Sequence, residues 1–263
     1  MPLRQGWATL AEALDVRAVI ISERDTQRPD SGHYLAPNEI WNTWSPESFF
    51  QELAEVPNYP SARKGNSKRL QISELEGSAA KWLFPAWEPI NGDFLGYPVP
   101  HFETYTIADL LTTPNSSPAV IFVYQPCPTA CYGVLDAAGK NWKFPEKTGL
   151  LTNEIVSGTD SVGIFIMRKR GIPCIWYGSE LSIHEARKFS HESNATEVQV
   201  AAGIYGALAW MMAESPKGIF TPEDLPYDFV LSKAKTFLGV MREYKFNLDP
   251  NQENTLRNAL RIE

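Results

Sequence analysis

The 263-residue chain contains no Gly-x-Gly-x-x-Gly sequence, the turn with which a dinucleotide-binding domain holds a diphosphate. It has only three cysteines, Cys127, Cys131 and Cys174, which excludes a disulfide-built scaffold. No histidine stands next to them, so we expect packed thiols and no metal site.

The chain has fewer basic than acidic residues: it contains 24 Lys and Arg and 31 Asp and Glu, which gives a net charge of −7. A nucleic-acid backbone calls for a basic face, so we expect no nucleic-acid partner.

The chain also lacks a long apolar run. Its most apolar stretch, 198–213, is interrupted by Gln199 and framed by Glu197 and Glu214, so it is too short and too polar at its edges to span a bilayer. Residues 1–7 lack the apolar core of a signal peptide. Together with the sparse cysteines, these features predict a cytoplasmic protein without membrane contact.

Strand patterns come mainly before helix patterns along the chain. β-Branched or alternating segments predict strands at 17–22, 69–73, 81–87, 94–99, 119–124, 162–167 and 174–177. Apolar spacing and capping residues predict helices at 3–14, 45–54, 106–111, 129–137, 182–188, 195–214 and 222–237. This order favours an α+β fold, with a mixed β-sheet covered by helices on one face. The first strand has no obvious parallel neighbour in the sequence.

Carboxylates follow the first predicted strand. Glu23, Arg24 and Asp25 stand just beyond its carboxyl end, where ligand sites of α/β sheets collect. A carboxylate there can bind an ammonium group through charge-assisted hydrogen bonds. The alternative is an internal salt bridge from Glu23 to Arg24 or Arg28.

An aromatic ring and a His–Glu pair are further candidates. A Trp44 face would attract a cation by about 1–2 kcal/mol once water is excluded, although a core role is open to both Trp41 and Trp44. His101 and Glu103 alternate along a segment that we expect to be extended, so both would project to one side. Such a pair can move protons near neutral pH, and the alternative is a hydrogen-bonded structural histidine.

From Trp7 to about Gly239 the chain resembles homospermidine synthases, members of the saccharopine-dehydrogenase-like group. The matches occur in order along the chain, which makes them stronger together than any single motif. They include SERDTQ at 22–27, NTWS at 42–45, TIAD at 106–109, YQPC at 124–127, NEIVSG at 153–158 and WYGS at 176–179.

The resemblance implies a reaction and a set of site residues. The family uses bound NAD to oxidise a diamine to an imine; ammonia leaves, a second putrescine adds, and the hydride returns to give homospermidine. The substrate-binding residues implied are Glu23, at the inner amine, and Glu52. The catalytic residues implied are Trp44, which lies over cationic intermediates, and His101 with Glu103, which line the centre and entrance of the tunnel with Glu52.

The missing glycine turn sets the expected domain organisation. The resemblance then covers the family's C-terminal portion, with residues 1–30 as the remnant of the α/β dinucleotide domain and 31–263 as a substrate-binding and dimerisation domain. NAD remains the expected cofactor, although we can assign it no residue and expect a separately encoded NAD-binding chain to be needed for activity. Putrescine or other polyamines and a second copy of the chain are the other expected partners. The alternatives are a non-catalytic polyamine-binding module and an inactive, truncated relic.

Overall fold

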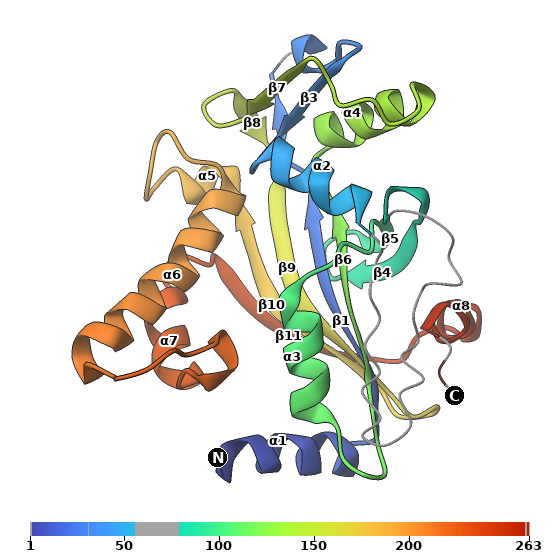
Figure 1. Ribbon diagram of the computed structural model, residues 1–263, viewed down its shortest axis with the longest axis vertical. Coiled ribbons are helices and arrows are strands. Elements are labelled where there is room, and N and C mark those ends of the chain that lie inside the picture. The colour runs from blue at the N-terminus through green and yellow to red at the C-terminus, as the bar shows by residue number, and fades with distance from the viewer. Residues whose placement is uncertain (1, 31, 56–78, 261, 263) are drawn as a thin grey trace.

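A mixed five-stranded sheet forms the centre of the molecule (Figure 1). The computed structural model describes residues 2–30, 32–55, 79–260 and 262, so the predicted strand at 69–73 lies outside the described residues. The strand order is β11-β10-β9-β1-β6, in which β1 and β6 run parallel and the other neighbours antiparallel. The bounds are β1 Val16–Asp25, β6 Ala119–Gln125, β9 Thr159–Arg168, β10 Cys174–Ser182 and β11 Val240–Phe246. The predicted α+β fold with a mixed sheet is confirmed.

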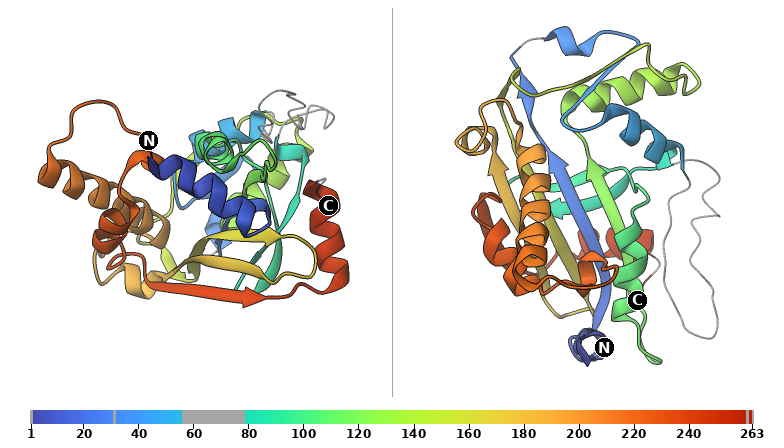
Figure 2. Two further views of the ribbon diagram at one scale, coloured as in Figure 1. Left: turned by 90° about the horizontal axis from the view of Figure 1, so that it is seen from below. Right: turned by 60° about the vertical axis from the view of Figure 1, so that its left-hand side comes forward.

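Both faces of this sheet are covered, so the prediction of one covered face was wrong. One face packs against a hairpin of β4 (Phe84–Glu88) and β5 (Gly92–Gly96) and against α8 (Pro250–Leu260). The buried ring of Trp176 is the largest fully buried side chain in this layer. On the other face, α1 and α3 lie beside the sheet (Figure 2). Helix α6 packs on β9 and β10, and α7 packs on α6. The bounds of the helices other than α8 are α1 Pro2–Ala13, α2 Pro46–Ala54, α3 Phe102–Leu111, α4 Pro128–Gly139, α5 Ile183–Ala186, α6 Ala195–Glu214 and α7 Tyr227–Ala234.

Short elements complete the chain. The two-stranded pairs join β2 (Arg28–Pro29) to β8 (Ile155–Ser157) and β3 (Glu39–Asn42) to β7 (Lys147–Leu150). Single turns of 3-10 helix occupy η1 Gly32–Leu35, η3 Ala79–Lys81 and η4 Pro222–Asp224. The helix predicted over 222–237 is therefore divided into η4 and α7, because Pro226 stands between them and cannot donate a helical hydrogen bond.

β1 lies inside the sheet and positions the candidate site. Its parallel neighbour, which the sequence did not reveal, is β6, and its antiparallel neighbour is β9. In this register Glu23 stands beside Tyr124 of β6, and Asp25 stands opposite Asp160 of β9. Successive side chains of a strand alternate between faces, so Glu23 and Asp25 share one face and Arg24 projects to the other.

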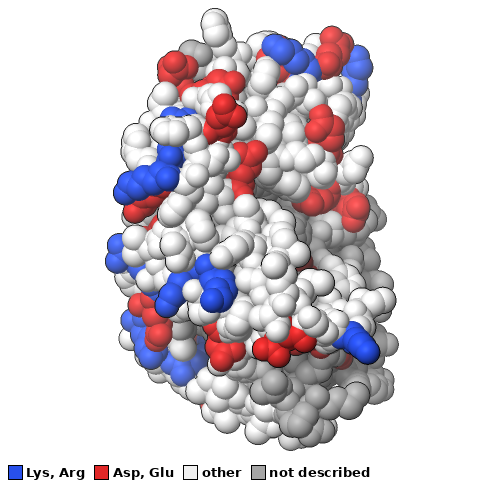
Figure 3. Space-filling model, turned by 90° about the vertical axis from the view of Figure 1, so that its left-hand side faces the viewer, with Lys and Arg blue, Asp and Glu red and all other residues white. Residues whose placement is uncertain are grey.

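The long helix α6 begins beside the carboxyl end of β1, where Ala195 N donates to Gln27 Oε1. Asn194 caps it: the side chain accepts from Glu197 N, and the Glu197 side chain accepts from Asn194 N, a complete capping box. Its outer face is apolar and exposed at Val200, Ile204, Leu208, Met211 and Met212. Figure 3 shows charged groups scattered over a mostly uncharged surface on this side of the molecule. Within the described ranges, no helix has the length and apolarity needed to cross a membrane.

Candidate functional site

Three carboxylates meet at the carboxyl end of β1. Asp25 and Asp160 are buried, at 2% and 0% exposure, and Glu23 is partly exposed. Asp25 accepts hydrogen bonds from Gln27 N at 2.7 Å, Gln27 Nε2 at 3.1 Å and Thr43 Oγ1 at 2.5 Å. Burial raises the pKa of Asp25 to about 6, against the lowering effect of these hydrogen bonds.

The alternative in which Glu23 pairs with Arg24 is not found. Arg24 lies on the opposite face of β1, where its Nη1 is 3.0 Å from Glu88 Oε1, and Arg28 is exposed. Within the described part of the chain, neither Glu23 nor Asp25 forms an ion pair with a lysine or arginine. No lysine or arginine of the described residues therefore competes with an amine for these carboxylates.

His101 is held between two of the predicted carboxylates. Its Nδ1 lies 3.0 Å from Glu103 Oε1, its Nε2 lies 3.7 Å from Glu52 Oε2, and its ring stacks on Phe122 with centroids 4.1 Å apart. The prediction of an extended 101–103 segment was wrong: His101 is the N-cap of α3 and Glu103 lies in the first helical turn, where a negative charge is favourable. The two side chains meet nonetheless.

The position of His101 between Glu103 and Glu52 determines its charge state. Burial alone would lower the pKa of its imidazole, but the interactions with Glu103 and Glu52 outweigh burial and raise the pKa to about 10. The ring is then a fixed cation at neutral pH, which disfavours proton transfer by His101 near pH 7. Burial alone would raise the pKa of the Glu103 carboxyl, but the hydrogen bond with His101 outweighs burial, so the pKa of Glu103 is lowered.

Trp44 joins the group through Tyr124. Its Nε1 donates to the Tyr124 hydroxyl at 3.1 Å, and its ring packs edge-on to Tyr124, with centroids 6.4 Å apart. Trp41 has a different environment, because its Nε1 donates to Glu39 at 2.7 Å and Lys147 Nζ lies 4.9 Å from its ring centre. Trp44 is thus the tryptophan at the carboxylates, and its indole is held by a hydrogen bond.

The electrostatics link the predicted residues into one group. The pKa of Glu23 is raised to about 8, first by burial and then by Asp25, Glu52 and Glu103, while His101 acts in the opposite sense. Burial, and then Glu23 and Asp25, raise the pKa of Tyr124 well above its usual value. The structure therefore places Glu23, Glu52, His101 and Glu103 within electrostatic reach of one another, with Trp44 attached by Tyr124.

Sequence reasoning missed two members of this group, Tyr124 and Asp160. Asp25 was named with Glu23 beyond the first strand as a carboxylate that could bind an ammonium group, but it was not among the predicted site residues. Strand alternation alone could have placed Asp25 on the face of Glu23. Tyr124 and Asp160 come from distant segments, and only the strand register brings them to β1.

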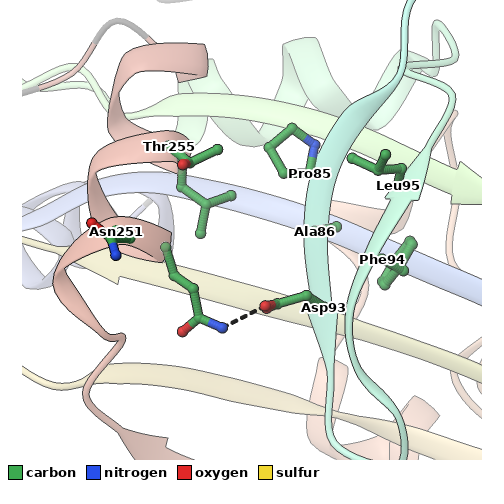
Figure 4. A pocket seen from close by; sticks show the side chains of 9 residues that line it. Pro85, Ala86, Asp93, Phe94, Leu95, Asn251 and Thr255 are labelled. Carbon is green, nitrogen blue, oxygen red and sulfur yellow. Dashed lines mark hydrogen bonds between the residues drawn. The ribbon is translucent and has the colours of Figure 1, made fainter.

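A separate cavity lies away from these residues. It measures about 370 Å³ and opens between the β4–β5 hairpin and α8, where Gln252 Nε2 donates to Asp93 (Figure 4). Its lining is mainly apolar, from Pro85, Ala86, Phe94, Leu95 and Leu256. It lacks the group of carboxylates that a diamine calls for, so we place the candidate site at the end of β1.

The cysteines have packing roles. Cys127 is buried in the core, with its Sγ 3.1 Å from Thr129 Oγ1, and all three cysteines are free thiols. Nowhere in the described ranges do three or more His, Cys, Asp or Glu side chains gather in a way that could hold a metal ion.

Known proteins resemble this chain along most of its length. The homospermidine synthase of Mesorhizobium japonicum is 29% identical over 268 residues, covering 94% of this chain and 54% of its own length. That of Blastochloris viridis is 29% identical over 253 residues, covering 90% and 52%. The crystal structure of the Legionella pneumophila homospermidine synthase in complex with NAD superposes with a TM-score of 0.83, at 29% identity, over 93% of this chain and 56% of that one. No protein-family model matches.

These comparisons confirm the predicted resemblance to homospermidine synthases and the fold class. The chain spans about half the length of the relatives that it matches.

Proposed function

We propose that this chain forms the diamine-binding part of a homospermidine-synthase-like enzyme, which moves an aminobutyl group between putrescine or spermidine molecules with NAD as hydride carrier. One observation carries the proposal: acidic side chains from β1, α2 and α3 converge with an indole where no lysine or arginine of the described residues neutralises Glu23. The relatives named above support the reaction class.

Each side chain has a task that its geometry supports. Glu23, at the inner end, accepts hydrogen bonds from one ammonium group of the diamine, and Glu52, whose Oε2 lies 3.7 Å from His101 Nε2, adds negative charge to the site. The Trp44 face stabilises positive charge on the carbon chain without adding a nucleophile. His101, as a fixed cation, holds Glu103 and Glu52 in place and donates a hydrogen bond, while Glu103 attracts the second ammonium at the entrance.

The described residues do not fit a dinucleotide. A dinucleotide site needs a strand-to-helix turn whose glycines let the backbone approach the diphosphate. The turn from β6 to α4 contains Pro126 and Cys127, and the turn from β3 to α2 contains Thr43, Trp44 and Ser45. Neither has a glycine, so residues outside the described ones must hold NAD, in this polypeptide or in a separate chain.

The same observation favours a second candidate, a polyamine-binding module without chemistry. Binding alone needs only the carboxylates and the indole. The two candidates separate when the chain is mixed with a NAD-binding partner domain, NAD and putrescine: homospermidine forms in the first case and is absent in the second.

Binding calorimetry with putrescine tests what both candidates share. We expect putrescine to bind, and the matched monoamine butylamine to bind at least about tenfold more weakly, because a second ammonium adds a charge-assisted hydrogen bond worth about 1.5–3 kcal/mol. Equal affinities for the two amines, or no heat with putrescine, would refute a diamine site.

A further inference from the structure

Asp160 is a buried acid that the proposed mechanism does not use. Its side chain is fully buried; Oδ2 accepts from Thr196 Oγ1 at 2.7 Å, and Oδ1 has no hydrogen-bond partner within the described ranges. It stands opposite Asp25 in the antiparallel register, on the face that also carries Glu23. We name Glu23, Asp25 and Asp160 the strand-end acid cluster.

A hydrogen-bond chain ties the two aspartates together. Gln27 Nε2 donates to Asp25 Oδ1 at 3.1 Å and to Thr196 Oγ1 at 3.2 Å, and Thr196 donates to Asp160. Asp25 receives three hydrogen bonds through its two oxygens, whereas Asp160 receives one from the Thr196 side chain and one from the Ser161 backbone. The ionised form is therefore better supported at Asp25, so a proton held by the pair resides on Asp160.

We propose that Asp160 carries a proton in the resting protein and acts as a positioning residue: a neutral acid whose lack of charge lets Asp25 stay ionised beside Glu23. A buried carboxylate without a cation is destabilised by several kcal/mol, and a proton on the orphan Oδ1 removes that charge. The raised pKa of Asp160, caused by burial and then by Glu23 and Asp25, agrees with this geometry.

The groups around Asp160 support the neutral form. From β1 it faces Glu23 and Asp25, and from β6 Tyr124, so its titratable neighbours are acids. From α6 it faces Thr196 and Gln199, and from β10 Leu181, all uncharged. The positive end of α6 favours an anion nearby. However, Ala195 N donates to Gln27 Oε1 and Glu197 N donates to Asn194 Oδ1, so these two N–H groups of the helix end do not stabilise a charge on Asp160.

This arrangement has a consequence for amine binding, which rests on the function proposed above. Glu23 is also largely protonated before an amine arrives, and an ammonium ion displaces its proton to the solvent while the amine stays protonated. Asp160 keeps its proton throughout. Diamine binding at neutral pH should therefore release close to one proton, all of it from Glu23.

Infrared difference spectroscopy of the ligand-free protein tests the proton on Asp160 independently of any amine. We expect the carbonyl stretches of two buried carboxylic acids at neutral pH, one of which is lost in Asp160→Asn and the other in Glu23→Gln. Should Asp160→Asn fail to fold, Thr196→Val retains Asp160, and its band must shift because a hydrogen bond is lost. A spectrum whose carboxylic acid bands are all unchanged in Asp160→Asn and in Thr196→Val would overturn the proposal, as would the absence of any such band.

Calorimetry with putrescine in two buffers of different ionisation enthalpy measures how many protons are released when the amine binds. We expect release of about one proton, unchanged in Asp160→Asn, with an affinity within about threefold of wild type, and release near zero in Glu23→Gln. A loss of more than about tenfold in Asp160→Asn would show that Asp160 binds as an anion and would overturn its neutral role. If putrescine fails to bind at all, the proposed function fails, while the infrared result still decides the state of Asp160.

Discussion

Replacing Glu23 with glutamine should weaken putrescine binding by about 10- to 100-fold, the effect of losing a charged hydrogen-bond partner worth about 1.5–3 kcal/mol. In the proposed site Glu23 is the acid at the inner end, and no lysine or arginine of the described residues pairs with it. Glutamine keeps the shape of the side chain and cannot take on the negative charge that Glu23 carries when an ammonium group is bound. Titration calorimetry at constant pH and low salt measures the change.

The matched control is Glu243→Gln on β11, where an exposed glutamate pairs with Lys245. This variant loses the same formal charge far from the site, so its affinity should stay within about twofold of wild type, as expected for a screened surface charge. Glu23→Gln should fold normally, because glutamine resembles the protonated form that burial favours at this position. An affinity of Glu23→Gln equal to that of Glu243→Gln would remove Glu23 from the site.

The second large effect is the dependence of the free energy of unfolding on pH. The folded pKa of His101, about 10, lies above its ordinary value of 6.5, so folding binds a proton there and stability is lost as pH rises between these values. The raised pKa values of Glu23, from 4.5 to about 8, and of Asp25, from 3.8 to about 6, act in the same direction over their own windows. The free energy of unfolding should thus be higher near pH 6 than near pH 9, by an amount on the order of a few kcal/mol.

His101→Gln should remove most of this slope between about pH 7 and about pH 9, and should lower stability near pH 6, because Glu52 and Glu103 lose the cation between them. His184→Gln is the control, since His184 is exposed on α5. Urea unfolding of wild type and both variants at the two pH values measures the difference. A slope in His101→Gln equal to that of wild type would show that the imidazole is not held as a cation.

Local chemistry was sufficient to predict several elements. Asn194 and Glu197 define the start of α6, because both residues of a capping box lie within four consecutive residues. The predicted bounds 195–214 are those observed. Ser45 caps α2 as expected, with Pro46 in the first turn, which places Glu52 near the helix end. Both features depend on neighbours in the sequence alone.

Non-local pairing could not be predicted in the same way. β11 forms an edge of the sheet, and α8 buries only a narrow apolar face with Leu256 and Leu260, so neither has a strong periodic pattern. The proximity of Asp160 and Tyr124 to Glu23 follows from strand register between distant segments. The candidate residues were therefore predicted from family motifs, and the acids that adjust their charge came from the fold.

The position of bound putrescine tests the central claim most directly. A crystal structure of the chain soaked with putrescine should show one ammonium nitrogen about 3 Å from a Glu23 carboxylate oxygen and the carbon chain beside the Trp44 ring. Putrescine bound instead in the cavity between the β4–β5 hairpin and α8, with the carboxylates at the end of β1 left free, would contradict the account.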